Sequence, residues 1–435
     1  MRPPYLLLTF IPLYRRADGA LLSDRLWHRD LVRHFEYIPH LRLACPVRDA
    51  AEAPDPGDLV AIEVPPGRRL EIAELPWTPS VGRAIALLPR TVRALARGIR
   101  DAGVVHSGIV GWPIPLGWIA NPIAMAARKP LVIVVESTPW RAERGRSPWR
   151  SLRAGITEAL GRYFVSRAEV CFFTHEGYRD ELGAKRRGRA CVTPATWIDE
   201  HDVLSTSDAE AAWVRRVLHP PRLLFAARLV PEKGIDVLLE ALALLDARGV
   251  AACVDIMGAG PRLEACERAA RELRTVSLRV RHPVPYGEVF FELLDEYHGA
   301  LVPLLGDEQP RILFDAFARA LPVIGSDAPG IARYVVEGVT GRLHARGDVA
   351  GLAESIEWAS HSVDDLCRMG GTARDRALEH THRAMHEARA RVLREHLGRQ
   401  GPVIEHPPVA MVHPPARRPR APRPEPVVDL ATEAS

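Results

Sequence analysis

The sequence predicts an α/β protein made of two doubly wound domains, each a parallel sheet covered by helices, which face each other across a cleft. Short apolar runs alternate with amphipathic helical patterns along most of the chain, which is typical of parallel sheets buried on both faces. The alternation begins again near residue 221, after a polar stretch at residues 199–207. The chain has 435 residues, of which 47% are hydrophobic and 26% charged, so it can bury two cores.

The first half shows the alternation in chain order. Strands are expected at residues 5–10, 41–45, 59–64, 104–106, 131–135, 170–173 and 190–193. Helices are expected at residues 24–37, 80–101, 115–127 and 149–167. These elements define a first domain at residues 1–198, followed by a linker at residues 199–220.

The second half is more regular. Strands are expected at residues 222–227, 251–257, 277–281, 300–304 and 322–326, with helices at residues 234–247, 261–274, 287–296 and 310–320. A second domain therefore spans residues 221–362 and includes a further helix at residues 348–360. One long helix at residues 363–397 is expected to cross back to the first domain. The proline- and arginine-rich segment at residues 398–435 is expected to be a disordered tail.

Charge and cysteine usage exclude several classes of function. The formal charge is only +4, so nucleic acid is not an expected partner. The six cysteines are scattered without a C-x-x-C pair, which argues against zinc and redox motifs and favours buried thiols in a reducing cytoplasm. The apolar run near the N-terminus reads as a buried strand, because it lacks a cationic start and a cleavage site. No apolar run is long enough for a membrane span, so we expect a cytoplasmic protein, with peripheral contact to the inner face of the membrane left open.

The loops that follow the second-half strands carry the candidate chemistry, because ligands bind beyond the carboxyl ends of parallel strands. The first loop, AARLVPEKG, contains Arg228 and Lys233 just before a helix. Two cations at that edge can hold a diphosphate. A solvated loop at the start of a helix is the alternative.

The second loop, GAGPRLE, contains Gly258 and Gly260, which would allow a ligand close to the backbone. The third glycine of a dinucleotide fingerprint is replaced by Leu263, so NAD is not expected. A tight turn alone would also explain the two glycines.

The third loop, DEQPRILFD, places Asp307 before a helix and Asp315 within it. Pro310 suits the first turn of a helix, and the free backbone N–H groups near Arg311 and Ile312 are expected to face the cleft. A carboxylate at this position can accept both hydroxyls of a ribose or sugar. The alternative is that Asp307 only caps the helix.

Together these segments resemble a known family. RLVPEKGIDVLLEAL, GAGPRLE, the D-x7-D segment running into AFARALPVIGSDAPGI, and EGVTGRL occur in the order and at the spacing of retaining GT-B glycosyltransferases. The resemblance is to family 4 (group 1) and covers residues 222–360 well. It implies the GT-B architecture, two Rossmann-like domains facing a cleft.

The resemblance also implies roles for the candidate residues. Arg228 and Lys233 match the pair that holds the donor diphosphate and stabilises the leaving group, which makes a catalytic metal unnecessary. Gly258 and Gly260 match the loop near the nucleotide. The aspartates of the D-x7-D segment match the two glutamates of the E-x7-E motif, the first near the transferred sugar and the second on the ribose.

The sequence departs from the family pattern in three places. Both glutamates are aspartates, the usual small glycine-rich spacer is replaced by EQPR, and Arg333 stands where an acidic residue is common. Pro310 removes one backbone N–H group from that spacer. Arg311 could supply a replacement phosphate contact.

The acceptor is expected to bind to the first domain. Gly19, His106 and Glu136 are the candidates for the acceptor site or cleft, although a lone histidine is more often structural. The segment WRAERGRSPWR carries four arginines and two tryptophans and could meet an anionic lipid-linked acceptor. A solvated surface loop is the alternative.

The expected function is transfer of a sugar from a UDP- or GDP-sugar to a glycan or lipid-linked acceptor, with retention and without a cofactor or metal. Synthesis of a bacterial cell-surface polysaccharide is the expected setting. Two alternatives remain open from the sequence. One is a non-catalytic nucleotide-sugar binder, and the other is a different enzyme of this architecture, such as a sugar-nucleotide epimerase or a phosphorylase.

Overall fold

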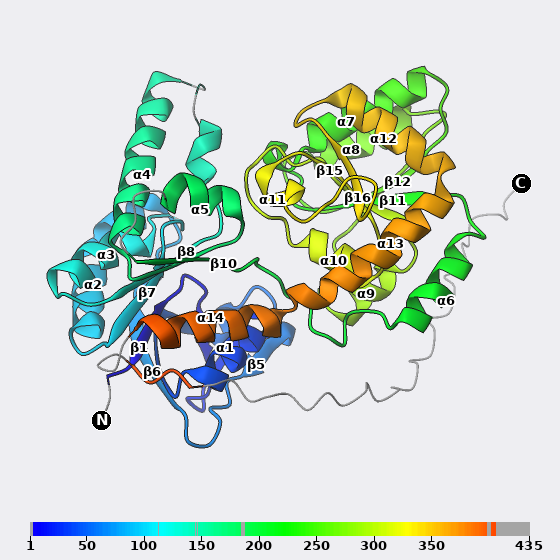
Figure 1. The fold of residues 1–435 in the computed structure, drawn as a ribbon. Coiled ribbons are helices and arrows are strands. Elements are labelled where there is room, and N and C mark those ends of the chain that lie inside the picture. The colour runs from blue at the N-terminus through cyan, green and yellow to red at the C-terminus, as the bar shows by residue number, and fades with distance from the viewer. Residues whose placement is uncertain are drawn as a thin grey trace, which may run out of the picture.

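The computed structural model describes residues 3–111, 113–143, 145, 147–183, 188–397 and 402–405. Figure 1 shows two α/β domains side by side, with the C-terminal helix returning to the first of them. Most of the segment expected to be a disordered tail lies outside the described residues.

The first domain contains a sheet with the order β10-β9-β8-β7-β1-β4-β2-β3-β5, and β6 also pairs with β4. The strands are β1 (Tyr5–Leu8), β2 (Leu13–Arg15), β3 (Leu21–Asp24), β4 (His40–Asp49), β5 (Leu59–Ala61), β6 (Arg69–Leu75), β7 (Val104–Gly108), β8 (Leu131–Val135), β9 (Val170–Phe173) and β10 (Arg189–Val192). All pairs are parallel except β2–β3 and β3–β5. The parallel part reverses its order between β1 and β7, so its switch point lies there.

Helices cover both faces of the first sheet. They are α1 (Arg25–Tyr37), α2 (Val81–Arg100), α3 (Leu116–Ala126), α4 (Pro148–Arg167) and α5 (Glu176–Gly183). Residues of α2, α3, α4 and α5 pack into one apolar cluster, and α1 packs into the cluster on the other face. Asp24, Ser80 and Ser147 cap α1, α2 and α4 by accepting backbone N–H groups, which satisfies donors that have no partner within the helix.

The second domain has a six-stranded parallel sheet with the order β13-β12-β11-β14-β15-β16. Its strands are β11 (Arg222–Ala226), β12 (Cys253–Met257), β13 (Ser277–Arg281), β14 (Gly299–Val302), β15 (Val323–Ser326) and β16 (Gly341–His344). The helices are α7 (Ile235–Ala247), α8 (Leu263–Glu272), α9 (Glu288–Leu294), α10 (Ile312–Ala318), α11 (Pro329–Ala332) and α12 (Val349–His361). The order reverses between β11 and β14, so a ligand is expected beyond the ends of these two strands.

The segments between and after the domains differ from the expectation. The expected linker contains a helix, α6 (Thr206–Arg216), whose Trp213 Nε1 donates to the carbonyl of Ala320, 3.0 Å away, in the second domain. The crossing helix is two helices, α13 (Val363–Ala377) and α14 (His382–His396), separated by a 3-10 turn at Leu378–His380. The break occurs because Thr381 caps α14, accepting the Ala384 N–H at 3.2 Å. Figure 1 shows α13 against the second domain and α14 beside α1.

Two further features concern the state of the cysteines and the apolar character of the helices. All six cysteines are free thiols, three of them buried and three half-buried. Among the described helices, none combines the length and apolar character that crossing a bilayer requires.

Candidate functional site

A cleft of about 1110 Å³ lies between the domains, beyond the carboxyl ends of β11 and β14. The second domain contributes the loops after β11, β12, β13, β14 and β16. The first domain contributes residues 136–139, Leu26, Arg141, Ala195 and Trp197. The position is the one that the strand order predicts for a ligand. The volume is large enough for a nucleotide sugar, since small-ligand sites typically occupy about 300–1,000 Å³.

The loop after β11 brings Arg228 and Lys233 to the cleft. Arg228 is exposed, and its guanidinium has no hydrogen bond or ion pair with another residue in the described part of the chain. Lys233 Nζ lies 3.0 Å from Glu308 Oε1 in a partly buried ion pair. This loop therefore offers one open cation, Arg228, and one cation, Lys233, whose partner an anionic ligand would have to replace.

The two glycines of the loop after β12 differ in their position relative to the cleft. Gly258 lines the cleft, whereas Gly260 is not among the lining residues. A Cβ atom on Gly258 would lie 2.0 Å from the carbonyl oxygen of Ala227, and one on Gly260 would lie 2.6 Å from that of Leu229. Gly260 also has φ +152°. Glycine is thus required for the close packing of this loop against the loop after β11, and a ligand is not needed to explain it.

Asp307, after β14, is held by two arginines. Its Oδ1 accepts from Arg346 at 2.8 Å, and its Oδ2 accepts from Arg141 at 3.3 Å. Arg346 follows β16 in the same domain, while Arg141 belongs to the first domain. Asp307 does not cap α10, because that helix begins at Ile312 and has no side-chain cap. The carboxylate instead joins the two domains at the cleft.

Asp315 lies inside α10 and is buried at the base of the cleft. Burial raises its pKa to about 7, although the hydroxyl of Tyr286 donates to its Oδ1 at 2.8 Å and opposes the shift. A buried carboxylate that has one hydrogen-bond donor retains acceptor capacity for further hydroxyl groups. This is the chemistry expected of a ribose-binding acid.

The start of α10 faces the cleft as expected. Arg311, Ile312 and Pro310 line it, and the guanidinium of Arg311 lies over the ring of Trp197, 5.0 Å from its centroid. Gln309 is buried and accepts the backbone N–H of Ala195 at 2.8 Å. The spacer that departs from the family pattern therefore contacts the first domain.

The three first-domain candidates do not lie together. Glu136 is exposed and lines the cleft. His106 does not reach it, because its side chain is buried in β7 with Nδ1 2.9 Å from the hydroxyl of Tyr5. Gly19 occupies the turn between β2 and β3 with φ +87°, also away from the cleft lining. For His106 the structural alternative holds, and Gly19 serves the left-handed turn.

The arginine-rich segment has one residue in the site. Arg141 contacts Asp307 and also lies 3.1 Å from Glu158 and 2.5 Å from Glu181. Burial alone would raise the pKa of Glu158, but the hydrogen bonds from Arg141 and Trp140 lower it to about 2. Arg150 is exposed on α4, and the other two arginines of the segment, at positions 144 and 146, lie outside the described residues.

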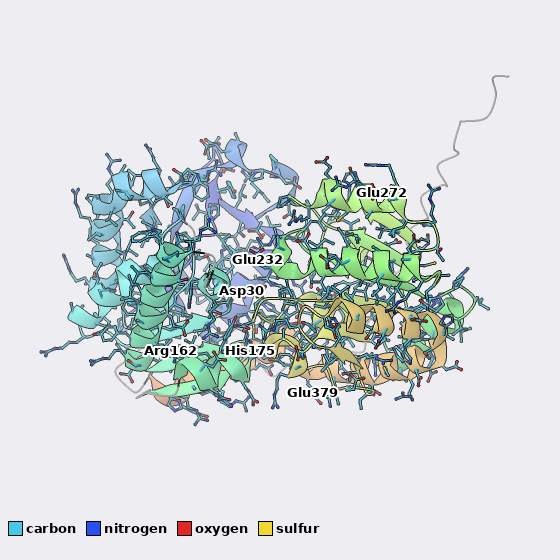
Figure 2. The ribbon with its side chains drawn as sticks, turned by 90° about the horizontal axis from the view of Figure 1, so that it is seen from above. Asp30, Arg162, His175, Glu232, Glu272 and Glu379 are labelled. Carbon is cyan, nitrogen blue, oxygen red and sulfur yellow. The ribbon has the colours of Figure 1, made fainter. Side chains whose placement is uncertain are left out.

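Further contacts between the domains lie beside the cleft. Arg333 pairs with Glu176 of α5 at 3.1 Å, and the hydroxyl of Tyr334 donates to the carbonyl of Thr174 at 2.6 Å. His175, labelled in Figure 2 at the edge of the first domain, is buried with no hydrogen-bond partner for either ring nitrogen among the described residues. Burial lowers its pKa to about 4, against the opposing effects of first the backbone and then the carboxylate of nearby Asp307.

The residues that sequence reasoning missed are Glu308, Tyr286 and Arg346. Glu308 was noted only as part of the unusual EQPR spacer. An acid in this loop could have indicated an ion pair with one of the two cations expected at the same edge of the sheet, Arg228 and Lys233. Tyr286 follows β13, an expected strand, so its position at the end of a strand could have indicated it. Arg346 follows β16, but the sequence analysis did not predict that strand.

Comparison with known proteins gives a sequence likeness for the second domain. Residues 220–361 match the family model of the group 1 glycosyl transferases. The chain is 30% identical over 166 residues to the amylovoran biosynthesis glycosyltransferase AmsK of Erwinia amylovora, covering 35% of this chain and 39% of that protein. The chain spans 39% and 60% of the length of two curated relatives that it matches.

Solved structures extend the likeness to both domains. Sucrose-phosphate synthase from Thermosynechococcus elongatus superposes with a TM-score of 0.65 at 16% identity, over 91% of this chain and 99% of that one. Anabaena Alr3699/HepE in complex with UDP superposes with a TM-score of 0.60 at 15% identity, over 90% and 100%. The chain therefore has the GT-B fold, and its second domain carries the sequence pattern of the group 1 glycosyl transferases.

Proposed function

We propose that the protein transfers a sugar from a nucleoside diphosphate sugar, UDP- or GDP-linked, to a glycan or a lipid-linked acceptor. The observation that carries the proposal is the cleft at the switch point of the second sheet, which Arg228, Lys233 and the buried Asp315 all line. A relative over part of the chain is an amylovoran biosynthesis glycosyltransferase, and a protein of the same fold was crystallised with UDP. Synthesis of a bacterial cell-surface polysaccharide is the setting that fits them.

The donor would lie with its ribose toward Asp315 and its diphosphate toward Arg228 and Lys233. Arg228 is available, whereas Lys233 would exchange Glu308 for a phosphate oxygen. Charge-assisted hydrogen bonds of this kind contribute about 1.5–3 kcal/mol each. They would also stabilise the charge that develops on the leaving nucleoside diphosphate, so no catalytic metal is required.

Retention of configuration is part of the proposal. Departure and attack on the same face of the sugar need no enzymic nucleophile, because a phosphate oxygen of the donor can assist the incoming hydroxyl. Asp307 is a poor nucleophile, since each of its oxygens accepts a hydrogen bond from an arginine. Its role in this reading is to orient the sugar and hold the domains together.

A lipid-linked acceptor would fit the outer surface of the first domain. Helix α4 exposes Trp149, Leu152, Ile156 and Tyr163 along one face, with exposed fractions of 45–72%. Exposed arginines flank this stripe, and α2 has five arginines, no acidic residue and a similar row of exposed aliphatic side chains. Basic amphipathic surfaces of this type bind anionic membranes, which would place the protein at the inner face of the cytoplasmic membrane.

A non-catalytic nucleotide-sugar binder is the second candidate, with an epimerase of the same architecture behind it. The specific observation in its favour is that the polar groups around the expected sugar position are already engaged. Asp307 is bound by Arg141 and Arg346, and Lys233 is bound by Glu308. A binding protein would keep these contacts, while a transferase must rearrange them during turnover.

The first experiment is a thermal shift with UDP, GDP, ADP and NAD on the wild type and on Arg228→Ala/Lys233→Ala. We expect one nucleoside diphosphate to raise the Tm of the wild type and to have no effect on the double variant. The matched control is Arg248→Ala/Lys129→Ala, which removes the same charges away from the cleft and should keep the shift. No shift with any nucleotide would contradict the donor site.

Turnover separates the two candidates. Release of the nucleoside diphosphate from the matching nucleotide sugar, in the presence of membrane lipid extract as acceptor source, is expected of a transferase. Binding without release in the presence of that extract would favour the non-catalytic candidate, and a changed sugar still attached to the nucleotide would favour the epimerase.

A further inference from the structure

A buried group of three metal-ligand side chains lies outside the cleft, where α14 returns to the first domain. Asp30 of α1 and His382 and His386 of α14 are each at most 8% exposed. Figure 2 labels Asp30 near the junction of the two domains. We call these three residues the α1–α14 cluster.

The three ligand atoms of the cluster lie close enough together to surround one ion. Asp30 Oδ1 lies 3.1 Å from His382 Nε2 and 3.1 Å from His386 Nε2, and the two Nε2 atoms are 3.2 Å apart. The histidines are four residues apart, so they share one face of the helix. Ligands of a tetrahedral zinc ion with bonds of about 2.0–2.1 Å are separated by about 3.3–3.4 Å, which is close to the distances in the cluster.

Hydrogen bonding alone accounts poorly for this arrangement. Because the three atoms form a nearly equilateral triangle, two N–H groups would approach one carboxylate oxygen about 60° apart, whereas the lone pairs of that sp² oxygen point roughly 120° apart. The two donors would compete for one lone pair while their nitrogens stood at 3.2 Å. A cation between the three atoms removes that conflict, since both nitrogens and the oxygen then act as electron-pair donors.

Hydrogen-bonding neighbours support two of the three ligands, Asp30 and His386, as an outer shell does in metal sites, whereas Nδ1 of His382 is buried without a hydrogen-bond partner among the described residues. The Nδ1 of His34 lies 3.1 Å from the second oxygen of Asp30, and the Nδ1 of His386 lies 3.1 Å from the hydroxyl of Tyr37. Ring nitrogens and carboxylates that bind metals are commonly oriented by such contacts. The ring of His382 stacks on Trp197 at 5.0 Å between centroids, which fixes its orientation.

We propose that Asp30, His382 and His386 bind a divalent transition metal ion, zinc by ligand preference, which holds α14 on the first domain. Imidazole and carboxylate ligands in tetrahedral geometry suit Zn²⁺, and three protein ligands leave a fourth position for water. The site is separate from the donor cleft, so the proposal stands or falls independently of the proposed transfer reaction.

The position of the ion gives it a structural role. The backbone N–H of His382 donates to the carbonyl of Ile198 at 2.7 Å, so the outgoing and returning connections between the domains meet beside the cluster. Helix α14 also contacts α1, β9 and β10. The ion therefore holds α14 on the first domain, beside the two connections between the domains. It thereby strengthens the link between the two domains.

The test uses the full chain without a histidine tag, stripped with a chelator and dialysed. Zinc content after addition of Zn²⁺ and removal of the excess is measured by mass spectrometry, and Co²⁺ is added separately for its visible absorption spectrum. We expect about one ion per chain, a tetrahedral Co²⁺ spectrum and a rise in Tm of roughly 5 °C on zinc binding. The variants Asp30→Asn and His386→Ala should lose the ion and the rise in Tm.

His396→Ala is the matched control, because His396 lies on the same helix but is partly exposed and bonds only within it. It should retain one ion per chain. If the cluster variants do not fold, the stoichiometry and the Co²⁺ spectrum of the wild type still decide the question. A wild-type chain that retains no zinc, with an unchanged Tm and an octahedral Co²⁺ spectrum, would overturn the proposal and leave the cluster as hydrogen-bonded side chains.

Discussion

Replacement of Asp315 by asparagine tests the electrostatics at the base of the cleft. Asp315 is 4% exposed, and burial raises its pKa from the ordinary value of 3.8 to about 7. Asparagine has nearly the same shape and can accept the same hydrogen bond from Tyr286. The substitution therefore removes the titration of this side chain while leaving its packing in place.

The expected effect follows from proton linkage. Between pH 5 and 7 the native state holds the proton on Asp315 while the unfolded chain has lost it, so the free energy of unfolding falls as the pH rises. The stabilisation from the protonated group is fully present below pH 3.8 and is lost as the pH rises through about 7. Two pH units at about 1.4 kcal/mol each amount to about 3 kcal/mol.

The assay is urea unfolding of the wild type and of Asp315→Asn at pH 5 and pH 8. We expect the difference in stability between them to change by about 3 kcal/mol in favour of the variant on going to pH 8. Asp375→Asn, which removes an exposed carboxylate, should leave the difference unchanged. A difference for Asp315→Asn that stays constant within about 1 kcal/mol between the two pH values would refute the reasoning.

Three further substitutions test contacts at the cleft. Glu308→Gln should tighten binding of the preferred nucleoside diphosphate by about fivefold in calorimetry, because it releases Lys233 from a pair worth roughly 1 kcal/mol. Gly258→Ala should lower the free energy of unfolding by about 1–3 kcal/mol, since its new Cβ would lie 2.0 Å from the carbonyl oxygen of Ala227. Arg141→Ala should cost about 3 kcal/mol in urea unfolding, because it strips a buried carboxylate of its main cation.

Each of these substitutions has a matched control. Glu232→Gln removes another acid from the cleft lining and should not tighten binding as Glu308→Gln does. Gly371→Ala adds a methyl group to α13 where no atom lies within 4 Å, and it should be neutral or stabilising. Arg162→Ala removes the more exposed partner of Glu158 and should cost less than about 1 kcal/mol. Equal effects for a substitution and its control would contradict the contact in question.

The elements with strong local signals were predictable from the sequence. Strands β8 (Leu131–Val135), β9 (Val170–Phe173) and β13 (Ser277–Arg281) have the expected bounds, because continuous apolar runs identify buried parallel strands. The long helices α1, α2 and α4 begin within a residue of the expected position, where a capping side chain marks each start.

Weaker local signals were missed. Strand β6 is partly exposed and mixes charged with apolar residues, and β16 has only four residues. Neither shows the continuous apolar run by which buried strands are identified, so both become visible only through their pairing with β4 and β15.

By itself the sequence determined the fold class, the second-domain loops that line the cleft and the two acids of the D-x7-D segment, because these depend on local pattern and fixed spacing. The tertiary structure alone decided which charges meet. Lys233 pairs with Glu308, and Asp307 lies between arginines of both domains. His106 is buried in the core of the first domain. Asp30 contacts two histidines that are more than 350 positions away in the chain. Such contacts join residues distant in the chain, and their energies depend on burial and distance, which no local pattern specifies.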